Sequence, residues 1–113
     1  MTLYQYRYRE YGEEQIICTP LEVKESPKTY GIIGNGRFAN YSTRLDKDKI
    51  GTIIDRYDYA TVLTEKDDDK ARNILLDCVT KQMEALNDKL KEKQECFEKI
   101  QNAEIKEKYI FQL

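Results

Sequence analysis

A run of alternating tyrosine and arginine residues near the start of the chain carries the side chains best suited to binding a ligand. Tyr6 and Tyr8 alternate with Arg7 and Arg9. Residues two apart in a strand share a face, so the tyrosines and the arginines are expected on opposite faces. Aromatic rings stack on bases, and guanidinium groups hold phosphates. Together with Arg37, these residues form a candidate site for a nucleotide-type or single-stranded ligand.

The same tyrosines allow two other interpretations. Tyrosine has an apolar ring and a polar hydroxyl, so nine tyrosines in 113 residues also suit a surface that contacts another protein. Alternatively, Tyr4, Tyr6 and Tyr8 cover a sheet face beneath a helix while the arginines point to solvent. The sequence leaves all three interpretations open, and either face of this first strand can be the functional one.

The composition removes much of the usual catalytic chemistry. The chain contains no histidine, which excludes a Ser-His or Cys-His nucleophile, an imidazole base and a histidine-containing zinc site. Cys18, Cys78 and Cys96 are too widely spaced for a CxxC metal site or a disulfide framework. The acidic run 67–69 is consecutive, and consecutive helical residues point about 100° apart, so it does not converge on an ion. We expect a protein that is not an enzyme and holds neither a metal nor a cofactor.

A seven-residue repeat of large side chains occupies the C-terminal part of the chain. An offset of three residues between its two registers places both on one narrow stripe of a helix. A helix over residues 76–100 is roughly 35 to 40 Å long, which exceeds the usual width of a domain of this size. Part of the stripe is therefore expected to pack on another chain. We name the following eight positions the helix seam and predict that they form the contact of a homo-oligomer, a dimer or higher: Leu76, Val79, Met83, Leu86, Leu90, Lys93, Phe97 and Ile100.

Lys93 stands in the helix seam where a large apolar residue would otherwise fall. A polar residue at such a position often fixes the register or the number of chains in a coiled coil. At a frayed helix end, by contrast, the lysine stem packs while its ammonium group reaches water. Both explanations remain open. Cys96 lies beside the seam, so two copies of it could approach one another in a dimer.

The first half of the chain predicts β-strands. Residues 3–11 alternate as a half-buried strand does, and residues 15–19 are expected to return after a turn at residues 12–14. Pro20 has no N–H to donate and is expected to interrupt the ladder, with residues 21–25 continuing along the sheet edge.

Gly34-Asn35-Gly36 is the strongest turn signal in the sequence. Asn-Gly accommodates positive φ, so a hairpin is predicted between strands at residues 29–33 and 37–41. The segment also resembles the start of a phosphate-binding loop, but the Gly-Lys-Ser/Thr ending and the following helix are missing. The hairpin is the favoured interpretation.

The middle of the chain is less regular. Residues 43–54 predict either a turn or a short helix capped by Asp46 and ended by Gly51. Residues 56–64 alternate in hydrophobicity and predict another strand. Thr64 and Asp67 then imitate a capping box, which starts a long helix at residue 64.

We therefore predict an α+β fold in a single domain, residues 1–113. Residues 1–63 form an antiparallel sheet of about four to six strands, and residues 64–102 form one long C-terminal helix, or a helical hairpin broken near Asn87-Asp88 or Asn102. The tail, residues 103–113, is expected to dock as a last strand. The helix is expected to pack on the sheet through Ala71, Leu75 and Cys78.

The charge and hydropathy patterns bear on partners and location. Nineteen basic and 21 acidic residues give a net charge of −2, so no overall field attracts duplex nucleic acid. No apolar run approaches the roughly 20 residues that span a bilayer, and the start lacks the pattern of a signal peptide. We expect no membrane association and a cytoplasmic location.

The order of these segments resembles small accessory proteins of phages and prophages of Gram-positive bacteria. The resemblance rests on the tyrosine-rich first strand, the segments 25–30 and 42–47, the strand with Tyr57 and Tyr59, and the charged helix. It implies a non-enzymatic anti-defence protein in the host cytoplasm that sequesters a nucleotide-type immune signal. An alternative is an inhibitor that occupies a host defence complex, such as a CRISPR nuclease, by protein contact. A third is a structural coiled-coil scaffold.

Overall fold

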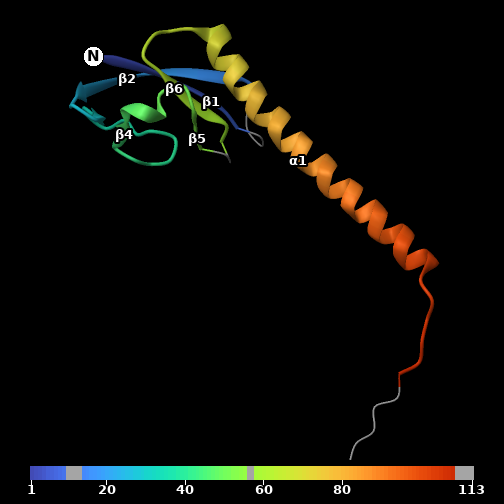
Figure 1. Ribbon diagram of the computed structural model, residues 1–113. Helices are drawn as coiled ribbons and strands as arrows, with labels where there is room; N and C mark the ends of the chain where they lie inside the picture. Colours follow the sequence, from blue (N-terminus) through green and yellow to red (C-terminus); the bar gives the residue numbers. More distant parts are fainter. Residues whose placement is uncertain (10–13, 56–57, 109–113) are drawn as a thin grey trace, which may run out of the picture. The chain divides into compact units, whose positions relative to one another are not determined.

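The computed structural model describes residues 1–9, 14–55 and 58–108. The chain divides into two compact units, Met1–Thr80 and Lys81–Leu113. The first unit holds the strands and the first turns of the C-terminal helix, and the second holds the rest of that helix and the residues after it (Figure 1).

Six strands form one antiparallel sheet in the order β4-β3-β2-β1-β6-β5. In chain order they are β1 (Thr2–Tyr8), β2 (Ile16–Glu25), β3 (Thr29–Ile32), β4 (Arg44–Asp46), β5 (Ile53–Asp55) and β6 (Ala60–Leu63). A single 3-10 turn, η1 (Lys47–Lys49), follows β4, and helix α1 (Asp68–Asn102) follows β6. This architecture confirms the predicted α+β fold with an N-terminal antiparallel sheet and one long C-terminal helix.

Strand β1 lies inside the sheet and contributes side chains to two hydrophobic clusters, one on each face. On one face, Leu3 joins a buried cluster, and the buried side-chain amide of Gln5 accepts a hydrogen bond from the backbone N–H of Ala39 at 2.7 Å. Side chains alternate along a strand, so the tyrosines of β1 face the other side. The members of the larger cluster are Leu3, Leu21, Val23, Tyr30, Phe38, Leu45 and Val62.

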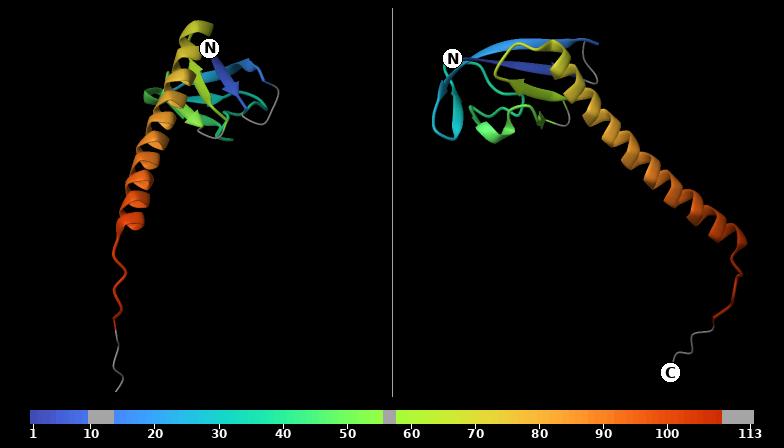
Figure 2. Two further views of the ribbon diagram at one scale, coloured as in Figure 1. Left: turned by 90° about the vertical axis from the view of Figure 1, so that its right-hand side faces the viewer. Right: turned by 45° about the horizontal axis from the view of Figure 1, so that its top comes forward.

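The first turns of α1 cover the second face of β1 and β6 (Figure 2). Tyr6 packs there with Leu63 and with Ala71 of the helix. The predicted contact of the helix with the sheet is confirmed for Ala71, which packs with Tyr6 and Leu63. Leu75 is also buried, and Cys78 is half-buried. Tyr6, with 2% of its surface exposed, is part of the core beneath the helix.

The hairpin predicted around Gly34-Asn35-Gly36 is wrong. β3 pairs with β4, opposing Tyr30 to Leu45, and residues 37–41 form a loop. The backbone N–H groups of that loop have other acceptors, because Phe38 N–H donates to Ser42 O and Ala39 N–H donates to Gln5. Gly34 has a positive φ of 94°, but Asn35 and Gly36, where the Asn-Gly signal placed it, do not.

The predicted break at Pro20 is also wrong, because β2 runs continuously through it opposite Tyr4 of β1. β3 pairs with β2 only between Val23 and Glu25. At Pro20 the outer side of β2 therefore has no partner among the described strands, and a missing N–H is tolerated at such an edge.

The ambiguous middle segment resolves into a turn and a strand. Asp46 occupies the N-cap position of η1 without a side-chain cap hydrogen bond, and Gly51, with φ of 75°, follows. β5 then pairs with β6 through an irregular register between Ile53 and Asp55. Within the predicted strand 56–64, the ladder covers Ala60–Leu63, and residues 56–57 lie outside the described part.

Helix α1 begins at Asp68, four residues later than predicted. The carboxylate of Asp67 accepts the backbone N–H of Lys70 at 3.0 Å, and the Asp67 carbonyl accepts that of Ala71 at 3.1 Å. Asp67 is therefore the N-cap, and the side chains of Asp68 and Asp69 add negative charge to the first turn. The capping-box interpretation took Thr64 as the N-cap, whereas Asp67 is the N-cap, so it placed the helix start too early.

After Asn102 the described residues 103–108 are exposed and have no regular secondary structure. The predicted docking of the tail as a strand concerns mainly residues 109–113, which lie outside the described part of the chain.

Candidate functional site

The helix seam is solvent-exposed in the single chain. Val79 is half-buried and Lys93 is exposed, while the remaining six side chains are large, apolar and each more than half exposed. Leu86, for example, is 64% exposed and Phe97 is 66% exposed. α1 stays helical across all eight positions, so their heptad spacing places them on one stripe. Seven of the eight positions are apolar, and Lys93 is the polar exception.

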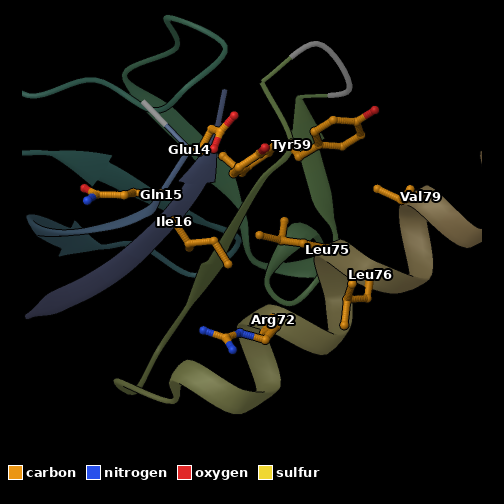
Figure 3. A pocket seen from close by; sticks show the side chains of 9 residues that line it. Glu14, Gln15, Ile16, Tyr59, Arg72, Leu75, Leu76 and Val79 are labelled. Carbon is orange, nitrogen blue, oxygen red and sulfur yellow. The ribbon is translucent and has the colours of Figure 1, made fainter. Parts of the chain in front are cut away.

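A cleft of about 620 Å³ lies beside the start of the seam, within the first unit. Its two sides are the end of the sheet and the second and third turns of α1. Ile16 from β2 and Leu75 from α1 point toward one another across it (Figure 3). Its lining residues are Tyr8, Glu14, Gln15, Ile16, Tyr59, Arg72, Leu75, Leu76 and Val79.

Aromatic rings line one side of this cleft. The centroids of Tyr8 and Tyr59 lie 6.5 Å apart with their ring planes tilted by 35°. Leu76 and Val79 of α1 also line the cleft, and they are the first two positions of the helix seam. The cleft and the helix seam therefore share two apolar side chains, both in the first unit.

The five predicted ligand-binding residues do not lie together in one site. Tyr6 is buried beneath α1, and Tyr8 lines the cleft. Arg7, on the other face of β1, forms an ion pair with Asp58. Arg9 is exposed, and Arg37 is exposed and donates to the carbonyl of its neighbour Gly36 at 2.6 Å.

Of the five residues, Tyr6 and Arg7 thus already have partners within the fold. In addition, Nε of Arg7 is buried without a hydrogen-bond partner among the described residues. The role of the five residues in ligand binding stays a prediction.

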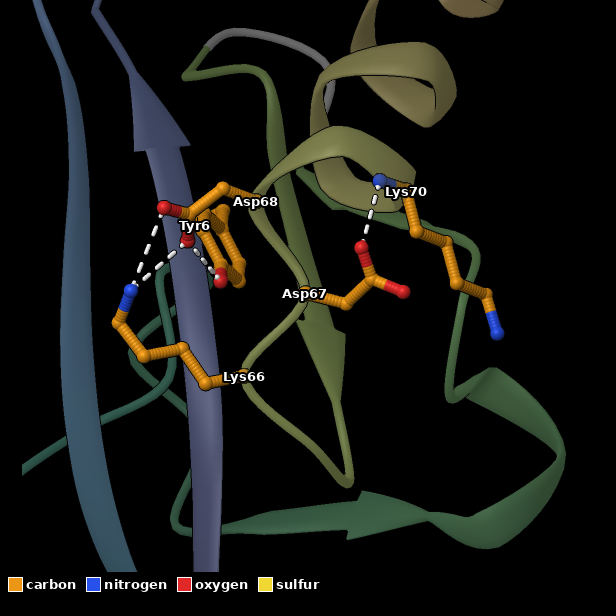
Figure 4. A network of polar contacts seen from close by, with 5 residues as sticks. All are labelled: Tyr6, Lys66, Asp67, Asp68 and Lys70. Atoms are coloured by element: carbon orange, nitrogen blue, oxygen red, sulfur yellow. Dashed lines mark hydrogen bonds and ion pairs between the residues drawn. The ribbon is translucent and has the colours of Figure 1, made fainter.

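A polar network ties β1 to the start of α1 (Figure 4). The Tyr6 hydroxyl donates to the Asp68 carboxylate at 2.6 Å, and Lys66 Nζ donates to the same carboxylate at 3.1 and 3.2 Å. Burial, followed by the hydrogen bond to Asp68, raises the pKa of the Tyr6 phenol. The hydrogen bonds from Tyr6 and then from Lys66 lower the pKa of the Asp68 carboxyl.

This network predicts a stability that depends on acid pH. Because the Asp68 pKa is lower in the folded chain, the carboxylate adds to the free energy of unfolding above its ordinary pKa of 3.8. This contribution is lost as pH falls below that value. Tyr6→Phe removes the donating hydroxyl, so the Asp68 pKa should rise toward 3.8 and the acid-induced loss of stability should shrink. Carboxyl-carbon NMR titration of Asp68, together with urea unfolding between about pH 2 and pH 7, measures both effects.

Tyr4→Phe is the matched control, since it removes a tyrosine hydroxyl from the same face of β1 and should leave the Asp68 pKa in place. An equal rise of the Asp68 pKa in Tyr6→Phe and Tyr4→Phe would show that the Tyr6 hydroxyl is not the donor that lowers this pKa. The Tyr6 phenol has the opposite pH dependence, because its pKa is raised in the folded chain. Its contribution to folding stability is fully present below about pH 10 and is lost as pH rises further.

The described residues offer little else that could perform chemistry. Within them, no group of three His, Cys, Asp or Glu side chains is placed to hold a metal ion. Cys18, Cys78 and Cys96 are free thiols, and Cys96 is exposed. Over the same residues, no helix is both long enough and apolar enough to cross a membrane.

Comparison of the chain with protein-family models, with curated proteins and with solved structures found no match. The fold and the exposed surfaces are therefore the basis for assigning a class. They define an α+β protein whose main exposed feature is an apolar stripe along a helix, with a cleft at one end of that stripe.

The sequence analysis found the helix seam but not the cleft. Ile16, Arg72 and Leu75 come from segments that are far apart in the chain, and no spacing rule connects them. The only available signal was the abundance of tyrosine on the strands, which contributes Tyr8 and Tyr59 to one side of the cleft.

Proposed function

We propose that this protein is a non-enzymatic binding protein that acts as a homo-oligomer assembled through the helix seam. The observation that carries the proposal is the exposure of six large apolar side chains at heptad spacing on one helix. Leaving such a stripe in water costs free energy, since burying each of these side chains is worth about 1.5 to 3 kcal/mol. Pairing with the same stripe of a second copy buries it on both chains at once.

The proposed role of the assembled protein is to occupy a partner protein. The resemblance to phage accessory proteins supports an inhibitor of a host defence component, and the helix start offers the exposed carboxylate of Asp69 as a charged contact, beside Asp67 and Asp68, which cap the helix and bind Tyr6. Sequestration of a nucleotide-type signal stays a prediction from the sequence. We place it second, because Tyr6 and Arg7 of its expected site are engaged by Asp68 and Asp58.

Light scattering coupled to gel filtration tests the assembly, and native mass spectrometry of protein purified from bacterial cells tests for a retained ligand. We expect twice the chain mass of 13.4 kDa, or a higher multiple, with no small molecule attached. A monomer at every concentration would contradict the proposal. An oligomer carrying the added mass of a nucleotide would instead favour sequestration.

A further inference from the structure

The cleft lies where the helix seam begins, and this position suggests what fills it. Leu76 and Val79 belong to both surfaces. A second helix that packs on Leu76 and Val79 therefore contacts side chains that line the cleft. Which of its side chains reaches the cleft depends on the direction in which the second helix runs.

Lys93 distinguishes the two possible directions. In a parallel pair each seam residue faces its own copy, so Lys93 faces Lys93 and two like charges meet in the contact. In an antiparallel pair that uses all eight positions, Lys93 faces Met83 of the second copy. Methionine is flexible and apolar, so it can pack against the lysine stem while the ammonium group reaches water. The antiparallel pair avoids the like-charge contact.

The antiparallel register joins the first seam position to the last. It brings residues from opposite ends of the two seams together. Counting inward from the ends, the facing positions are Leu76 with Ile100, Val79 with Phe97, Met83 with Lys93, and Leu86 with Leu90.

We propose that two copies pair with their α1 helices antiparallel and that the cleft of each receives Phe97 of the other. Phe97 is the one aromatic residue of the seam and is 66% exposed in the single chain. In this register it faces Val79 of the other copy, which lines the same cleft as Tyr8 and Tyr59. An aromatic ring packs well against Tyr8 and Tyr59, because edge-to-face contacts between rings add to the gain from burial. The inference rests on the proposed assembly through the seam and adds its direction and the occupant of the cleft.

Disulfide trapping determines the direction. In a Cys78→Ala, Cys96→Ala background, which also serves as the control without an added thiol, Leu76→Cys and Ile100→Cys are made separately. In the antiparallel pair the two copies of residue 76 are about 36 Å apart, far beyond the reach of a disulfide. We expect neither single variant to form a covalent dimer by itself and a mixture of the two, refolded together, to form one. Efficient dimers of Leu76→Cys alone would establish the parallel pair and overturn the inference while keeping the seam contact.

A double-mutant cycle identifies the occupant of the cleft. Ile16 lies on β2, outside the helix seam, so it affects dimerisation only if the partner enters the cleft. We expect Ile16→Ala and Phe97→Ala each to raise the dimer dissociation constant about tenfold and the double variant to raise it by much less than the product. Ile17→Ala is the matched control, since its side chain lies on the other face of β2, and it should leave the constant unchanged.

Independent effects of Ile16→Ala and Phe97→Ala, or no effect of Ile16→Ala, would show that Phe97 does not occupy the cleft. Monomeric protein in the unsubstituted chain would overturn the proposed assembly itself. The failures of the two proposals are therefore distinguishable.

Discussion

Replacing Leu86 with glutamate is expected to convert the oligomer into monomers. Leu86 lies in the middle of the helix seam and is 64% exposed in the single chain, so the substitution removes little from the core of the monomer. In the assembled pair it would place an unpaired carboxylate within the apolar contact of each chain, which costs several kcal/mol per buried charge. We expect light scattering to report the chain mass of 13.4 kDa at concentrations where the unsubstituted protein is oligomeric.

Ala85→Glu is the control for this substitution. It adds the same side chain and the same charge at the neighbouring exposed position, which points about 100° away from the seam. The oligomer should persist in that variant, and circular dichroism should report equal helix content in both. An oligomer that survives Leu86→Glu with its helix intact would show that the contact lies elsewhere.

Replacing Phe38 with alanine is expected to cause the largest loss of folding stability of any single change in the loop between β3 and β4. Phe38 is 1% exposed and belongs to the larger hydrophobic cluster with Leu3 and Val62. Truncation of a buried phenylalanine typically costs about 3 to 5 kcal/mol, from lost burial and the cavity left behind. Urea unfolding followed by circular dichroism should show a midpoint lowered by a corresponding amount.

Tyr41→Ala provides the comparison within the same loop. Its side chain is 82% exposed, so truncation should change the free energy of unfolding by no more than about 0.5 kcal/mol. Because the side-chain amide of Gln5 also holds this loop through Ala39, the loss at Phe38 should leave β1 and β2 paired. Similar losses in the two variants would indicate that Phe38 does not anchor the loop.

The two substitutions report on separate parts of the chain. Leu86 belongs to the second compact unit and Phe38 to the first. We therefore expect Leu86→Glu to lower the mass in solution without lowering the free energy of unfolding of the first unit. Phe38→Ala should lower that free energy. The assembled mass can still change after Phe38→Ala, because Leu76 and Val79 of the seam belong to the first unit.

The sequence by itself determined the elements whose signals are local and periodic. Period-two alternation predicted β1, and seven-residue periodicity without glycine or proline predicted α1 and the eight positions of the helix seam. These patterns are reliable because one buried face of a strand or helix imposes its own spacing on the residues that form it. The sequence analysis also predicted that the helix contacts the sheet near Ala71, which the structure confirms.

Tertiary structure alone decided which segments meet. The segment Gly34-Asn35-Gly36 predicted a hairpin, but β3 pairs with β4 instead. The backbone N–H groups of the following residues donate to Ser42 and Gln5. Alternation already placed Tyr6 and Arg7 on opposite faces of the first strand, but only the structure identified their partners, Asp68 and Asp58, which come from distant segments. Local spacing fixes the direction of a side chain relative to its own backbone, whereas its partners depend on the packing of the whole chain.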